Sequence, residues 1–258
     1  MPAGRPYELY YWPGIPGRGE FVRLALEEAG APYVDLVREP KSKGGGVDAM
    51  MKALRAAGPL EPFAPPFLKS GRLVIGQTAN ILLYLGPRHG LVPADAQSRF
   101  KAHQIQLTVA DLVAEVHDTH HPIGVDLYYE DQKAEAKKRA AAFLRTRAPK
   151  FLGWFERVLV ATGRKGFLGG RLSYVDLSIF QVLSGLEYAF PRAMRRELGR
   201  VPHLRELAAR VAARPRIAAY LASDRRIPFN EDGIFRHYPE LDASRAGSRE
   251  RRRSRSSA

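Results

Sequence analysis

Hydrophobic and polar positions divide the chain into two regions with different patterns. In roughly the first 85 residues, short apolar runs typical of strands alternate with segments of helical period. Strands are expected at 8–12 and 33–37, a hairpin at 67–69 and 72–75, and helices at 20–29, at 50–56 and directly after Gln77. Beyond residue 93 almost every segment has a helical period, which predicts helices at 96–118, 133–145, 150–160, 175–188 and 204–213.

The order of these elements indicates the fold class. A strand–helix–strand unit followed by a hairpin and a helix describes a small α/β domain, and such a first unit is normally parallel and right-handed. Gly86 and Pro87 form a strong helix stop, and the turn-rich residues after them indicate a linker. We therefore expect an α/β domain at 1–86, a linker at 87–93, an all-helical domain at 94–240 and an Arg/Ser-rich tail at 241–258.

Net charge changes this picture only near the C-terminus. The 258-residue chain carries a formal charge of +14, and the segment from Ala243 onward holds six arginines and one glutamate. Because this segment has no apolar periodicity, we expect it to be disordered. It could bind RNA or another polyanion, but a solvated tail is the preferred interpretation, and nucleic acid is not expected as a partner of the folded body.

Several kinds of chemistry are excluded by what the sequence lacks. It contains no cysteine, which excludes disulfides, thiol nucleophiles and thiolate metal sites and fits a cytoplasmic protein. No stretch approaches the ~20 apolar residues of a membrane helix, and the N-terminus does not have the pattern of a secretory signal. The run "HDTHH" places His117 and His121 four residues apart. A catalytic zinc site normally requires a third protein ligand, and the sequence shows no second cluster that would supply one, so no metal is expected.

Three local patterns, in the expected order, resemble the cytosolic glutathione transferase family. They are "LYYW…GRGEFVR" at the first strand, turn and helix, "PFLKSGRLVIGQTANILLYL" across the hairpin and the next helix, and "FLGGRLSYVDLSIF" in the helical region. The likeness extends over about residues 7–222 and implies a thioredoxin-like α/β domain followed by an all-α domain. In the third pattern, Ser173 and Asp176 have the spacing of a helix capping box, which is structural in every interpretation.

The resemblance implies a glutathione site on the α/β domain. Gln77 and Thr78 open a helix, whose free backbone N–H groups and dipole favour the γ-glutamyl carboxylate; Thr78 as a plain N-cap is compatible with that role. Asp111 on the first long helix could reach the glutamyl ammonium, across a dimer interface in several members, or be an ordinary exposed charge. One of Lys41, Lys43 and Lys52 is expected to meet the glycyl carboxylate.

A proline pair before the third strand departs from the family pattern. Pro66 corresponds to the family's cis-proline. The residue before it usually pairs with the cysteinyl backbone through its N–H and its C=O, but Pro65 has no N–H. Only the acceptor half of that pairing is left, unless Ala64 takes over the other half.

The residue that activates the thiol is expected to be a tyrosine. Family members use Tyr, Ser or Cys near the end of the first strand, whereas this chain has no cysteine and no Ser or Thr before Ser42. Tyr11 fits the pattern and stands closer to the turn than Tyr10, which remains the alternative. Its phenol would donate a hydrogen bond to the glutathione sulfur and favour the thiolate. Arg18 corresponds to an arginine that adds positive charge near the sulfur, although the turn here is one residue longer.

These features predict a tyrosine-type, bacterial-like glutathione transferase that joins glutathione to a hydrophobic electrophile, as a homodimer. The helix end at "HDTHH" would border the second-substrate pocket, with Tyr128 and Tyr129 near it or packed in the core. A transferase-like binding or assembly module without catalysis is the alternative, motivated by Pro65, the longer turn and the basic tail. Binding of nucleic acid ranks last, because no recognised motif supports it.

Overall fold

The computed structural model describes residues 5–242, and the basic segment from Ala243 onward lies outside the described residues. A four-stranded sheet has the strand order β2-β1-β3-β4. Its strands are β1 (Tyr7–Tyr10), β2 (Tyr33–Asp35), β3 (Phe67–Ser70) and β4 (Leu73–Gly76). β1 pairs with β2 in parallel, while β1 with β3 and β3 with β4 are antiparallel, as the strand–helix–strand and hairpin patterns predict.

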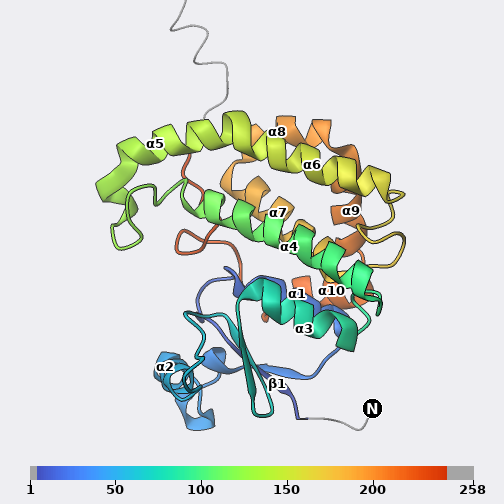
Figure 1. The fold of residues 1–258 in the computed structure, drawn as a ribbon. Coiled ribbons are helices and arrows are strands. Elements are labelled where there is room, and N and C mark those ends of the chain that lie inside the picture. Colours follow the sequence, from blue (N-terminus) through green and yellow to red (C-terminus); the bar gives the residue numbers. More distant parts are fainter. Residues whose placement is uncertain (1–4, 243–258) are drawn as a thin grey trace, which may run out of the picture.

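Helices cover both faces of this sheet (Figure 1). They are α1 (Gly19–Ala29), α2 (Val47–Arg55) and α3 (Thr78–Arg88). Leu9 and Leu68 pack with α1 and α3 on one face, whereas Tyr10 and Phe67 pack with Met50 of α2 on the other. Tyr10 therefore lies on the α2 face, whereas Tyr11, the residue after the strand, packs under the turn at Gly17 and Gly19.

The second part of the chain is helical and lies against α1 and α3 (Figure 1). Its helices are α4 (Ala96–His117), α5 (Lys133–Ala142), α6 (Ala148–Ala161), α7 (Tyr174–Ala189), α8 (Pro191–Glu197), α9 (Pro202–Ala212) and α10 (Pro215–Leu221). The main hydrophobic core contains Phe21, Leu24 and Leu82 together with residues of these helices. One continuous core therefore joins the α/β domain to the helical domain. The predicted fold class, a thioredoxin-like α/β domain followed by an all-α domain, is confirmed.

Several predicted boundaries need correction. The first strand ends at Tyr10 rather than residue 12, and α3 continues through Gly86 and Pro87 to Arg88. After α10, residues 223–242 form no helix or strand, so the region up to 240 is not wholly helical. Leu241 and Asp242 are buried and not part of a tail, because the Asp242 carboxylate accepts hydrogen bonds from the N–H groups of Arg192 and Ala193 at the start of α8. Seven-residue helices such as α8 and α10, each opened by a proline, are too short to have a distinct apolar period.

The α7 capping box is present as predicted. The Asp176 carboxylate accepts hydrogen bonds from Ser173 N–H at 2.6 Å and from Phe167 N–H at 3.0 Å, and Asp176 is fully buried. Between α5 and α6 the chain forms a π-helical turn at Phe143–Arg147. Within residues 5–242, no helix is long and apolar enough to cross a membrane.

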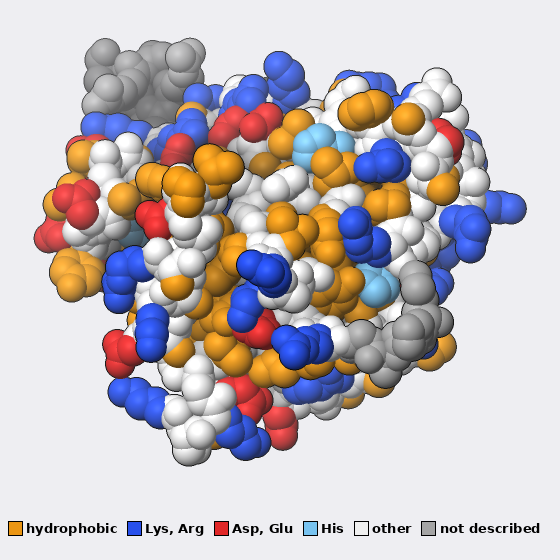
Figure 2. All heavy atoms as spheres, turned by 60° about the horizontal axis from the view of Figure 1, so that its bottom comes forward, with side chains coloured by type: hydrophobic (Ala, Val, Ile, Leu, Met, Phe, Trp, Pro, Cys, Tyr) orange, Lys and Arg blue, Asp and Glu red, His pale blue; other side chains and the backbone are white. Residues whose placement is uncertain are grey.

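Figure 2 shows the charged side chains on one face of the folded body. On the face shown in Figure 2, lysine and arginine side chains stand singly among acidic and hydrophobic ones. A nucleic-acid site would normally gather such side chains into a patch or stripe. This face therefore offers no such stripe.

Candidate active site

Tyr11 lies just beyond β1 and under the turn that leads into α1. Its ring contacts the backbone of Gly17 and Gly19, where an added Cβ would overlap it. Gly17 also has a φ of +44°, which favours glycine. The Tyr11 hydroxyl accepts a hydrogen bond of 2.9 Å from the Arg18 N–H. Gly17 and Gly19 are therefore required by the position of the tyrosine ring.

Burial controls the protonation of this phenol. Tyr11 is only 4% exposed, and burial raises its pKa, while the Arg18 N–H bond and the charges of Arg18 and Arg23 oppose that rise. The phenol is therefore protonated at neutral pH. Because its oxygen accepts from Arg18, its own O–H is free to donate to another group.

Tyr10 is in a different environment. Its hydroxyl donates to the Glu8 carboxylate at 2.6 Å, and its ring stacks on Phe67 with centroids 4.4 Å apart. Burial, together with Glu8, raises its pKa beyond the physiological range. The hydroxyl of Tyr10 is thus occupied on the α2 face of the sheet, away from the glycine turn.

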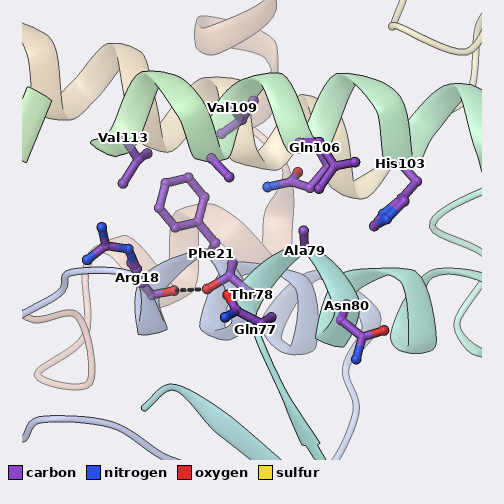
Figure 3. Close-up of a pocket in the computed structure, with 12 residues that line it drawn as sticks. Arg18, Phe21, Gln77, Thr78, Ala79, Asn80, His103, Gln106, Val109 and Val113 are labelled. Atoms are coloured by element: carbon purple, nitrogen blue, oxygen red, sulfur yellow. Dashed lines mark hydrogen bonds between the residues drawn. The ribbon is translucent and has the colours of Figure 1, made fainter. Parts of the chain in front are cut away.

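The N-terminus of α3 lies next to the same turn (Figure 3). The Thr78 hydroxyl donates to the Arg18 carbonyl oxygen at 3.3 Å, so the Arg18 backbone is held by Tyr11 on one side and Thr78 on the other. Gln77 precedes the helix with a φ of 66°, a strained conformation for a residue with a Cβ. Since the first helical hydrogen bond runs from Ile81 N–H to Gln77 C=O, the preceding N–H groups of the helix are available to an anion.

A pocket of about 270 Å³ opens between this turn, the start of α3 and the side of α4 (Figure 3). It is lined by Arg18, Phe21, Gln77, Thr78, Ala79, Asn80, His103, Gln106, Leu107, Val109, Ala110 and Val113. Among these lining residues none is acidic and one is a cation. The pocket therefore offers positive potential at one end and an apolar wall from α4.

The sequence-predicted residues are only partly gathered here. Arg18, Gln77 and Thr78 line the pocket. Tyr11 does not line it, but its hydroxyl accepts a hydrogen bond from the N–H of Arg18, which does. The Pro65–Pro66 peptide bond is cis, as predicted, and directly precedes β3, but neither proline lines the pocket. Asp111 is exposed on α4 and does not line it either, although its neighbour Ala110 does.

The histidines of "HDTHH" cluster where α4 ends. The helix stops at His117, so His117 and His121 do not share a helical face, yet their rings stack with centroids 4.9 Å apart. His120 is bonded to Ile234 C=O at 2.8 Å and to His121 Nδ1 at 2.6 Å. Burial lowers the pKa of His117 to about 4 and that of His120 to about 3. Over the described part of the chain, no group of three or more acidic, histidine or cysteine side chains is arranged to hold a metal ion.

The two tyrosines after this cluster differ. Tyr129 is buried, stacks on Tyr238 and donates to Glu240, whereas Tyr128 is 77% exposed. Tyr129 therefore has a packing role, and neither tyrosine lines the pocket beside α3.

Known glutathione S-transferases are similar to this chain in sequence. The sequence profile of the "Glutathione S-transferase, C-terminal domain" matches residues 117–224. Glutathione S-transferase P 1 of Xenopus laevis is 29% identical over 222 residues, covering 85% of this chain and 93% of that protein. Glutathione S-transferase A3 of Mus musculus is 26% identical over 231 residues, covering 89% and 94% of the two chains. Over most of its length the chain is therefore similar to glutathione S-transferases.

Solved structures agree on the fold. The Pi-class glutathione S-transferase of Onchocerca volvulus superimposes with a TM-score of 0.66 at 22% identity, covering 88% of this chain and 98% of that one. Prostaglandin synthase D of Nilaparvata lugens gives a TM-score of 0.65 at 19% identity, covering 86% and 100%. At these identities the likeness establishes the glutathione S-transferase fold.

Sequence reasoning missed the α4 side of the pocket. Gln106 is 1% exposed and lines the pocket, and its Oε1 has no hydrogen-bond partner. His103 lies one turn earlier and also lines the pocket, with an unpartnered Nδ1. Their three-residue spacing on a helix was the available signal, but it is common in helices and becomes informative only once α3 is placed opposite.

Proposed function

We propose that this protein is a glutathione transferase that activates the glutathione thiol with Tyr11 and transfers it to a hydrophobic electrophile. The observation that carries the proposal is the Arg18 backbone, held between the Tyr11 hydroxyl and the Thr78 hydroxyl. It connects a protonated phenol to a helix N-terminus that is suited to a carboxylate. The named relatives, which are glutathione S-transferases, support the choice of substrate.

The thiol end of glutathione would meet Tyr11. A protonated phenol that already accepts a hydrogen bond can donate a hydrogen bond through its own O–H to the sulfur and stabilise the thiolate, which forms as the thiol releases its proton to solvent. The Arg18 guanidinium, which lines the pocket, adds positive charge nearby. The thiolate then attacks an electrophilic carbon, the new S–C bond forms, and a leaving group such as chloride departs with the electrons of the broken bond.

The other end of the tripeptide would bind at α3. Its γ-glutamyl carboxylate is a suitable ligand for the N–H groups that begin at Thr78, with Gln77 beside them. The carbonyl of Pro65 would accept from the cysteinyl N–H, since Pro65 cannot donate. Asp111 would approach the glutamyl ammonium from a second subunit, because its side chain is exposed and lies outside the pocket of its own chain.

The glycyl carboxylate would be met by a lysine of the segment between β2 and α2. Lys41 and Lys43 are exposed and paired only loosely, with Asp48 at 3.4 Å and Glu39 at 3.6 Å. Such solvated pairs are weak and can be exchanged for a ligand carboxylate. Lys52 on α2 is the third candidate.

Two assays on the purified chain test the proposal. We expect retention on a glutathione resin, elution by free glutathione, and conjugation of glutathione to an activated chlorodinitrobenzene well above the uncatalysed rate. Retention without turnover would instead support the binding-module alternative, which is favoured by the covered position of the Tyr11 hydroxyl under Gly17. Failure of both assays would contradict the proposal.

A further inference from the structure

Gln106 is a buried polar side chain at the wall of the pocket between α3 and α4. It is 1% exposed, and its Oε1 makes no hydrogen bond to any described residue. A buried amide oxygen without a hydrogen-bond partner destabilises the folded protein. In Figure 3 its carboxamide extends from α4 toward the start of α3, above Ala79. The arrangement suits a polar group that arrives with a ligand.

The opposite wall of the pocket selects the charge of that group. Gln77, Thr78 and Ala79 form the N-terminus of an 11-residue helix, and Arg18 adds a cation. Both favour a carboxylate. No acidic residue of this chain lines the pocket, so the acceptors that this chain itself offers to an ammonium group there are neutral, and the Asp111 carboxylate proposed above would come from a second subunit.

A carboxamide meets both needs, because it has an acceptor oxygen and two N–H donors in one plane. Thr78 is already committed to the Arg18 carbonyl and Asn80 donates to the Gly76 carbonyl, whereas Gln106 is uncommitted. We propose that Gln106 binds the α-amino-acid head of the γ-glutamyl group from within the same chain and selects for it. This inference rests on the proposed function and adds a specificity-determining residue to its binding site.

Affinity for S-hexyl derivatives tests this assignment, because the hexyl group strengthens binding of both ligands. Isothermal titration would compare S-hexylglutathione with S-hexyl-cysteinylglycine, which lacks the γ-glutamyl head, on the wild type and Gln106→Met. We expect Gln106→Met to weaken S-hexylglutathione binding about tenfold or more and to leave binding of the headless ligand unchanged. Gln104→Met, on the exposed side of the same helix, is the matched control and should change neither.

Stability of the free protein separates binding from folding. Because the Gln106 Oε1 has no internal partner, Gln106→Met and Gln106→Leu should unfold at the same temperature as the wild type or higher. Equal affinity of wild type and Gln106→Met for S-hexylglutathione would overturn the inference. An equal loss of affinity for S-hexylglutathione and S-hexyl-cysteinylglycine in Gln106→Met would also overturn it. If either overturning result is found while the wild type binds and conjugates glutathione, only the role of Gln106 fails. If the wild type binds neither ligand, the proposed function fails as well.

Discussion

At the residue scale, the site depends on the absence of a side chain at Gly17. A Cβ there would overlap the Tyr11 hydroxyl, and the φ of +44° is unfavourable for alanine. A displacement of about 1 Å at a reacting group can cost on the order of a hundredfold in rate. We therefore expect Gly17→Ala to lower kcat/KM for conjugation roughly ten- to a hundredfold.

Gly14 provides the control within the same turn. It has no atom within 4 Å of an added Cβ, and its φ is not positive, so Gly14→Ala should keep nearly full activity. The measurement is kcat/KM for both purified variants under one set of conditions. If both variants retain wild-type activity, the glycine turn does not position the reacting group.

At the element scale, the loop after α4 and the segment 223–242 are joined through the histidine cluster. Burial, then the charges of His121, Arg18 and Arg236, lower the pKa of His117, and Asp118 opposes them. The pKa of His120 is lowered mainly by burial and also by the charge of Arg236. Because both folded pKa values lie below the usual 6.5, the neutral rings are favoured by folding. The contribution of these neutral rings to the free energy of unfolding is complete above about pH 6.5. It is lost as the pH falls toward the pKa values of the folded state.

This shift predicts an acid-sensitive folded state. Between pH 6.5 and 4.5 the free energy of unfolding should fall by about 2 kcal/mol for each of the two imidazoles, at 1.36 kcal/mol per pKa unit. This fall is measured by urea unfolding at both pH values, on the wild type and on the double variant His117→Gln, His120→Gln. The double variant should show a clearly flatter dependence. Identical slopes would contradict the assignment.

Sequence patterns predict the elements that have a long apolar period. The helices α1, α4, α6, α7 and α9 can be predicted, because apolar residues recur at helical spacing through each of them over two or more turns, although α1 and α7 are buried on nearly every side. The helices α8 and α10 and the segment 223–242 were not, because tertiary contacts such as those of Asp242 decide their conformation. For the candidate site, motifs indicate Tyr11, Arg18, Gln77 and Thr78, of which the last three line the pocket, whereas Gln106 is indicated only by the packing of α4 against α3.

At the scale of the whole molecule, a buried ionic network joins the two domains. Arg23 of α1 pairs with Glu20 at 3.2 Å and with Asp35 of β2 at 2.7 Å, and Glu20 also accepts from Tyr220 of α10 and pairs with Arg226. The apolar pattern of α1 indicated Phe21 and Leu24 as core residues but gave no sign that Glu20 and Arg23 are fully buried. Their burial follows from partners far along the chain, which a local pattern cannot reveal.

The predicted homodimer is also a property of the whole molecule. On α4, Phe100 and Leu107 are 72% and 48% exposed, and Asp111 is exposed on the same helix. If these side chains are buried against a second copy of the chain, Asp111 lies at the same interface and can make the proposed contact across it. Light scattering at micromolar concentration should therefore give about twice the mass of the 28.8 kDa chain. A monomeric mass would contradict the dimer and remove that role of Asp111.

The central claim is that Tyr11 activates the thiol, and a pH–rate profile under saturating glutathione tests it most directly. A free thiol has a pKa near 8.5, and a hydrogen bond to the thiolate contributes about 1.5–3 kcal/mol, or roughly one to two pKa units. Tyr11→Phe should lower the rate about ten- to a hundredfold near neutrality, with a deficit that shrinks as the pH rises. Tyr10→Phe should be nearly silent, since its hydroxyl pairs with Glu8. Wild-type rates for Tyr11→Phe across the profile, or the deficit in Tyr10→Phe instead, would contradict the claim.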